Sequence, residues 1–164
     1  MDSLIHREEQ EEGNSKLSRQ ALSFLMHTIL ALVSWLLFML LGYLVNPVGV
    51  PQFIILLLSA LVPLTVGYLI SRKRQDDMAP VIWLLGLIWI LIVSLWILDM
   101  PTGPNECFQC DATEKLSRTF FSIPKPSGLI DNDGPFLGTW PAAALMGYAL
   151  GAWLALRKHK PQED

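Results

Sequence analysis

Long apolar runs alternate with short polar segments along the chain. Four runs without Asp, Glu, Lys or Arg cover roughly residues 21–45, 53–70, 81–98 and 136–156. Each reaches or approaches the ~20 residues that a helix needs to cross ~30 Å of hydrocarbon. A surface helix of a water-soluble domain would carry a charged face, and none of these runs has one. The pattern predicts an all-α integral membrane protein, with four transmembrane helices in an antiparallel bundle.

The last of these runs has the clearest packing pattern. Small residues recur in it at every fourth position, so that on a helix they share one face: Ala143, Gly147, Gly151 and Ala155. Inside a bilayer, such a face lets the backbone of another helix come very close. We therefore predict that this face is a helix-packing surface, with Thr139 as the N-cap of the helix and Pro141 in its first turn.

Tryptophan residues lie near the ends of the third and fourth runs, where side chains at the membrane–water interface are expected. The predicted interface anchors are Trp83, Trp96, Trp140 and Trp153. Trp89 lies near the middle of its run and one heptad before Trp96. At that depth, a contact with the core of the protein or with a partner is the expected role.

Composition and charge narrow the class of protein. The chain has 164 residues, a length typical of one domain, and only 16% of them are charged. The net charge of −3 and the lack of a basic stripe with interleaved aromatics argue against nucleic acid as a partner. The first run begins after about twenty polar residues and is too long for a cleavable signal peptide, so we expect a signal anchor.

Lys and Arg residues predict the orientation. Nine of them fall in segments 1–20, 71–79 and 157–164, and three fall in the loop 99–134. The positive-inside rule places the basic segments in the cytoplasm and the loop 99–134 on the extracytoplasmic side of the membrane. We expect a polar cytoplasmic tail over residues 1–20, a basic cytoplasmic tail over 157–164, and a location in the inner (plasma) membrane of a bacterium.

The loop 99–134 contains a predicted helix of its own. Asp111 and Glu114 have the spacing of a capping box. Apolar residues follow at helical spacing until Pro124, which predicts a short amphipathic helix over residues 112–121 on the outer membrane surface. The segment 131–134 (DNDG) has too few acidic ligands for an EF-hand and is expected to form a turn.

Cys107 and Cys110 form a C-x-x-C motif just before this helix, and three functions are open. A structural disulfide on the oxidising side of the membrane is the simplest. Thiol–disulfide exchange is the alternative, because a nearby helix start lowers a thiol pKa. Membrane thiol oxidases relay electrons between two cysteine pairs, however, and this chain has one. A zinc site would need two further ligands. The loop has no His and no third Cys, and only carboxylates such as Glu106 and Asp111 remain, so we predict no metal and no cofactor.

Two residues inside the runs are candidates for a special role. His27 lies near the cytoplasmic end of the first run; a histidine inside a membrane is a functional candidate, but a shallow one is more often packed or directed toward the headgroups. Pro63 is expected to kink the second run, with Ser59 and Thr65 able to satisfy the freed carbonyl. In the loop after it, Asp76 or Asp77 is expected to start the third helix.

No charged residue lies in the middle of a run, which argues against proton-coupled transport. No nucleophilic triad or phosphate-binding glycine motif is present, so an enzyme is not expected. The preferred hypothesis is a non-catalytic membrane subunit that packs on a larger membrane complex or on copies of itself, with the lipid bilayer and other membrane subunits as its partners. The alternatives are an extracytoplasmic redox protein using Cys107 and Cys110, and a small channel or lipid-handling protein with Pro63 as a hinge.

Overall fold

The computed structural model describes residues 2–45, 52–100, 111–120 and 138–158. The elements in this part of the chain are α1 (Asp2–Val45), α2 (Gln52–Lys73), the 3-10 helix η1 (Pro80–Ile82), α3 (Trp83–Asp99), α4 (Ala112–Phe120) and α6 (Thr139–Arg157). Four helical segments, in α1, α2, η1 with α3, and α6, are long and apolar enough to cross a membrane. The prediction of a helical chain with four such segments is confirmed.

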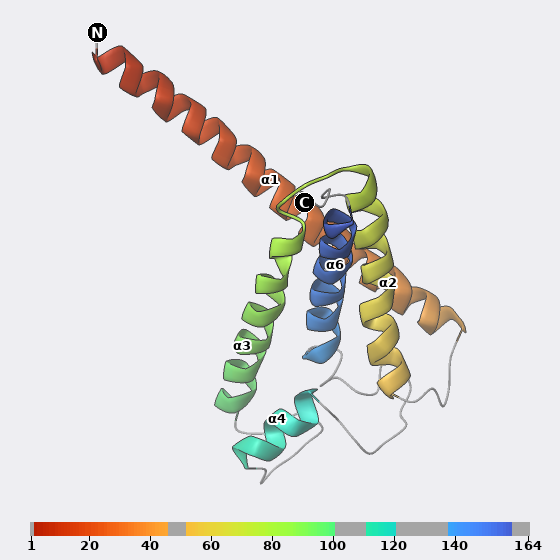
Figure 1. The fold of residues 1–164 in the computed structure, drawn as a ribbon. Coiled ribbons are helices and arrows are strands. Elements are labelled where there is room, and N and C mark those ends of the chain that lie inside the picture. Colours follow the sequence, from red (N-terminus) through yellow and green to blue (C-terminus); the bar gives the residue numbers. More distant parts are fainter. Residues whose placement is uncertain (1, 46–51, 101–110, 121–137, 159–164) are drawn as a thin grey trace, which may run out of the picture.

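Helix α6 lies at the centre of the arrangement. It contacts α2 most extensively, and it also packs against α3, η1 and α1. Helices α1 and α3 run in one direction, whereas α2 and α6 run in the other (Figure 1). The C-terminal ends of α2 and α6 therefore lie at the same end of the molecule, which also carries the 71–79 loop and which we call the basic end.

Helix α1 is longer than the sequence predicts. Residues 2–20, expected as a polar tail, are helical and continuous with the first apolar run. At about 1.5 Å per residue, the 44 residues extend about 66 Å, roughly twice the hydrocarbon thickness. The segment contains four Glu and two Gln, lacks proline, and has Gly13 as its weakest helix former. Figure 1 shows α1 crossing the other helices obliquely, with its N-terminal part projecting beyond them.

Helices α2 and α6 meet through their backbones. A Cβ atom added at Gly147 would lie 2.3 Å from the Ala60 carbonyl oxygen, and one at Gly151 would lie 2.1 Å from the Leu64 oxygen. From the other side, a Cβ at Gly67 would lie 2.3 Å from the Tyr148 oxygen. Because each obstacle is a backbone atom in a helix, no rotamer change can relieve the clash. The two helices can lie this close only while these positions are glycine.

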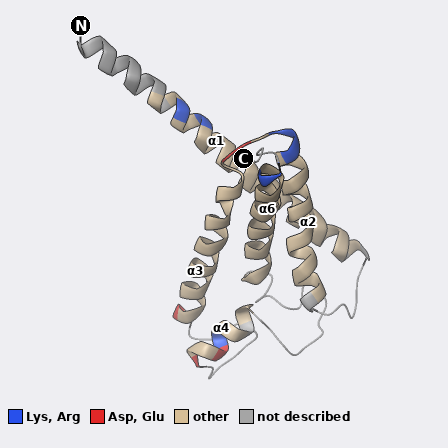
Figure 2. Cartoon of the chain, viewed as in Figure 1, with Lys and Arg blue, Asp and Glu red and all other residues tan. Residues whose placement is uncertain are grey.

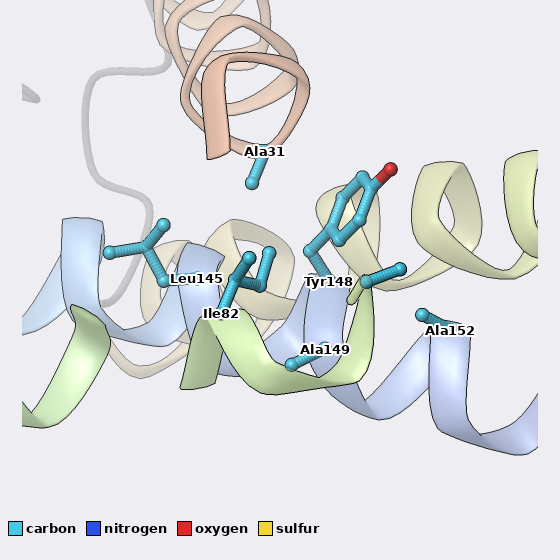
Figure 3. Packing of buried hydrophobic residues seen from close by; sticks show 7 residues of the cluster. Ala31, Ile82, Leu145, Tyr148, Ala149 and Ala152 are labelled. Atoms are coloured by element: carbon cyan, nitrogen blue, oxygen red, sulfur yellow. The ribbon is translucent and has the colours of Figure 1, made fainter. Parts of the chain in front are cut away.

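Two apolar clusters surround α6. The first joins α1, η1 and α6 near the basic end and contains Ala31, Ala79, Ile82, Leu145, Tyr148, Ala149 and Ala152 (Figure 3). The second joins α1, α2 and α6 and contains Trp35, Met39, Ile55, Trp140 and Ala144. Four of the seven residues in the first cluster are alanines, and its largest side chain, Tyr148, comes from α6 itself.

Helix α4 connects the C-terminal end of α3 to the N-terminal end of α6. The Lys115 Nζ atom donates a 2.6 Å hydrogen bond to the Met100 carbonyl at the end of α3. The Thr139 hydroxyl donates to the Phe120 carbonyl at the end of α4. Thr139 is thus the first residue of α6 and not its N-cap, which is Gly138. A Cβ at Gly138 would lie 2.9 Å from the Thr119 oxygen, so the close approach of α4 selects glycine there.

Proline 63 lies inside α2 without ending it. The Thr65 hydroxyl donates to the Val62 carbonyl over 2.7 Å, and not to the Ser59 carbonyl that the proline ring leaves free. The Ser59 hydroxyl is buried and has no hydrogen-bond partner in the described part of the chain. The expected rescue of the freed carbonyl by these two hydroxyls is therefore not what the structure shows.

Candidate functional site

A buried polar cluster lies between the apolar residues at the basic end. It consists of Ser23 and His27 on α1, Asp76 in the 71–79 loop and Tyr148 on α6, and we call it the His27 cluster. Ser23 and His27 are four residues apart and so share one face of α1. Tyr148 extends from α6 toward α1 (Figure 3), which brings its hydroxyl to the imidazole ring. The cluster links three segments that are distant in sequence.

One ring nitrogen of His27 has a hydrogen-bond partner, and the other lies near a carboxylate without forming a hydrogen bond. Its Nδ1 atom is 2.7 Å from the Tyr148 hydroxyl, and its Nε2 atom is 3.5 Å from Asp76 Oδ2. The ring is fully buried. With a neutral imidazole, the tautomer that suits both partners has the proton on Nε2, directed at the carboxylate, while Nδ1 accepts from the tyrosine hydroxyl.

Asp76 is the partly exposed end of the cluster, with 22% of its side chain accessible. Its carboxylate accepts hydrogen bonds from the Ser23 hydroxyl and, over 3.0 Å, from the Met78 backbone N–H. Burial by itself raises the pKa of this carboxyl group, but the two hydrogen bonds and the nearby His27 outweigh burial and lower the pKa below its ordinary value. Asp76 is therefore ionised at neutral pH and supplies the negative charge that faces the imidazole.

The connectivity of the cluster limits its chemistry. Serine, histidine and aspartate are present, but Ser23 donates to Asp76 directly and not to His27. A nucleophilic serine needs the histidine as its base, so this is not the arrangement of a serine hydrolase. No group of three or more His, Cys, Asp or Glu side chains suited to a metal ion occurs among the described residues. The geometry suits a structural polar contact that holds the 71–79 loop against α1 and α6.

The sequence identifies His27 as a candidate but gives no sign that it pairs with Tyr148 or Asp76. Tyr148 is 121 positions away, and helical periodicity gives the face of a residue but not its partner on another helix. Asp76 was expected to start the third helix. It does accept from the Met78 N–H, but the N-cap of η1 is Ala79, and Pro80 is the first residue of η1. Because a buried histidine needs hydrogen-bond partners, His27 itself was the one signal in the sequence that a polar cluster exists.

The predicted small-residue face lies inside the molecule. Gly147 and Gly151 contact α2, and Ala155 is 1% exposed. Ala143 is only partly buried. Helix α2 carries a matching row of buried residues, which was not predicted. They also recur at every fourth position: Ser59, Pro63, Gly67 and Ser71. Spacing alone would have revealed it.

The four predicted anchors divide into two groups. Trp83, Trp96 and Trp153 are each about half-exposed, which is compatible with the predicted anchor role. Trp140 is 2% exposed and belongs to the cluster with Trp35 and Ile55, because the start of α6 is enclosed by α1 and α2. Trp140 is therefore enclosed by other helices, whereas an interface anchor would face outward. Trp89 is 38% exposed.

The remaining predicted features fall outside the described residues. These are Cys107 and Cys110, with their structural and redox alternatives, and the turn at 131–134. The helix that follows the cysteine pair is present as α4 over Ala112–Phe120, and position 121, where the predicted helix ends, lies outside the described residues.

Comparisons with known proteins found no matching family model, no matching curated protein and no matching solved structure. A function for this chain therefore has to be argued from its own geometry.

Proposed function

We propose that this chain is a non-catalytic integral membrane subunit, an antiparallel bundle of four transmembrane helices that packs on a larger membrane complex or on further copies of itself. One observation carries the proposal, namely the unequal burial of the helices. In the most apolar stretch of each segment, 61% of the residues are buried in Thr139–Arg157 but only 22% in Pro80–Asp99. The small-residue face is used inside the chain, so contacts with a partner fall to other helices.

Helix α3 offers the most suitable surface for a partner. Trp89, Ile92 and Trp96 recur at helical spacing on one side, and they are 38%, 56% and 48% exposed. In a lipid-facing helix, tryptophan concentrates near the two membrane interfaces, whereas Trp89 lies near the middle of α3. Large aromatic side chains at such positions are typical anchors of protein–protein contacts. This α3 face therefore favours a membrane protein as its neighbour over lipid alone.

The His27 cluster supports a structural role rather than a catalytic one. It joins α1, the 71–79 loop and α6 through buried polar contacts, and it has no activated nucleophile. Buried polar ties of this kind fix one arrangement of helices in preference to others. A subunit that presents a fixed surface to a partner needs such ties.

The test is purification of the tagged protein from membranes in a mild detergent. The wild type is compared with the double variant Trp89→Leu/Trp96→Leu, and Leu150→Ala serves as control because it removes an exposed apolar side chain from α6 instead. We expect a companion polypeptide, or a homo-oligomer, that the α3 variant loses and the control keeps. A monomeric wild type without companions, or equal behaviour of both variants, would contradict the proposal.

A further inference from the structure

The basic end carries a group of exposed cations. Figure 2 shows them where α2 and α6 end and along the start of the loop that follows α2. They are Arg72, Lys73, Arg74, Arg157 and Lys158, and all five are exposed. Because α2 and α6 are parallel and in backbone contact at Gly151, their C-terminal ends and these cations belong to one surface. We call it the basic surface.

Little negative charge opposes these cations. In the described part of the chain, none of the five forms an ion pair with a carboxylate. The described loop after α2 has two acidic residues: Asp76 is held by Ser23, Met78 and His27, and Asp77 is exposed. The two helix C-termini contribute about half a negative charge each. Five cations outweigh these groups, so the surface attracts anions.

An aromatic ring lies beside the cations. The Arg157 guanidinium carbon is 5.2 Å from the centre of the Trp153 ring, a cation–π contact. Trp153 is 45% exposed and lies one turn before the end of α6. Tryptophan at the end of a transmembrane helix lies at the depth of the lipid headgroups, and an arginine next to it reaches their phosphates. This contact places the basic surface at headgroup level and away from the bulk solution.

We propose that the basic surface binds the headgroup of an anionic phospholipid. Arg72 and Lys73 from α2, with Arg157 and Lys158 from α6, supply charge-assisted hydrogen bonds to the phosphate oxygens, and Trp153 lies against the glycerol and upper acyl region. The inference rests on the proposed membrane location of the chain. Its specific content is that the two helix ends act together as one site, so that loss of either pair weakens binding.

The experiment measures thermal unfolding of the purified full-length protein in a neutral detergent. The added probes are phosphatidylglycerol, phosphatidylcholine and inorganic phosphate. The variants are Arg72→Gln/Lys73→Gln and Arg157→Gln/Lys158→Gln. The matched control is Lys16→Gln/Arg19→Gln, which removes the same charge from α1.

Phosphatidylglycerol is expected to raise the unfolding midpoint of the wild type and of the control alike. Each site variant should need at least about tenfold more of this lipid for the same shift, as the loss of two charge-assisted contacts implies. Phosphatidylcholine and inorganic phosphate should produce no comparable shift. If a site variant fails to fold, the wild type decides, because raised ionic strength should weaken its response to phosphatidylglycerol.

Three results would overturn the inference. The first is an equal loss in the control, which would mean attraction by overall charge and not by a site. The second is an equal response to inorganic phosphate, which would mean a site for the free anion. The third is a wild type that stays in the membrane after alkaline washing yet shows no preference for the anionic lipid, and this result leaves the proposed function intact. Release of the wild type by alkali would overturn both.

Discussion

Three glycines set the distance between α2 and α6. At Gly67, Gly147 and Gly151, the space that a Cβ would occupy is already filled by a carbonyl oxygen of the facing helix. At Gly86 the nearest atom is instead the Met146 Cγ, 3.1 Å away, which belongs to a flexible side chain. Gly13 has nothing within 4 Å. The same substitution thus meets three different environments in one chain.

Alanine substitutions at these glycines should change stability by amounts that follow this order. Gly147→Ala and Gly151→Ala should each lower the free energy of unfolding by about 1–3 kcal/mol, because the helices must separate. Gly86→Ala should cost less, since Met146 can move. Gly13→Ala is the control and should be neutral or gain up to about 1 kcal/mol in an exposed helix. Unfolding in mixed micelles measures all four, and equal effects at Gly13 and Gly147 would contradict the backbone contact.

Tyr148 tests the His27 cluster at a single atom. Tyr148→Phe removes only the hydroxyl and leaves Nδ1 of a buried imidazole without its partner, which should cost about 1–3 kcal/mol. Tyr68→Phe is the matched control, because Tyr68 makes no side-chain hydrogen bond in the described part of the chain. The two free energies of unfolding are compared directly. Equal values would show that the hydrogen bond contributes nothing.

Asp76 makes the stability depend on pH in a defined direction. Its pKa is lowered in the folded state, so the unfolded chain binds the proton more tightly. The stabilisation is therefore fully present above the ordinary carboxyl pKa and is lost as the pH falls through the lower, folded value. Asp76→Asn should remove this acid dependence, whereas Asp77→Asn, in the same loop, should leave it. Unfolding midpoints across the acid range decide, and an unchanged profile in Asp76→Asn would contradict the assignment.

Among the helices, α6 and α4 have contrasting roles. Helix α6 is enclosed by the other three apolar segments, while α4 joins the ends of α3 and α6 through two hydrogen bonds to backbone carbonyls. Sequence patterns predicted the existence of both helices. They placed the start of α6 incorrectly, because the choice between Thr139 and Gly138 as N-cap depends on α4 lying against that turn.

Thr139→Val should loosen the link between α4 and α6 while keeping the shape of the side chain. The loss of the hydrogen bond to the Phe120 carbonyl should cost about 0.5–1.5 kcal/mol. Hydrogen exchange of the α4 amides should become faster, while that of the middle of α6 stays unchanged. Ser117→Ala, at an exposed position of α4, is the control. Slow exchange at α4 in Thr139→Val would show that other contacts hold it.

For the whole molecule, the length and apolar character of the four segments were predictable, because lipid demands both from any helix that crosses it. The register of the small residues on α6 was predictable as well, since it follows from spacing alone. Partners were not. The pairing of α6 with α2, the meeting of His27 with Tyr148 and the burial of Trp140 depend on how helices far apart in sequence come together.

The proposed function requires that the chain crosses a membrane four times, with the N-terminus and the basic end on one side and α4 on the other. Single cysteines at Gly13, Gln75 and Ser117, in a background with Cys107 and Cys110 changed to serine, test this with an impermeant thiol reagent in sealed vesicles. Gly13→Cys and Gln75→Cys should react from the same side, and Ser117→Cys only from the opposite side. Reaction of all three cysteines from one side would contradict the four membrane crossings.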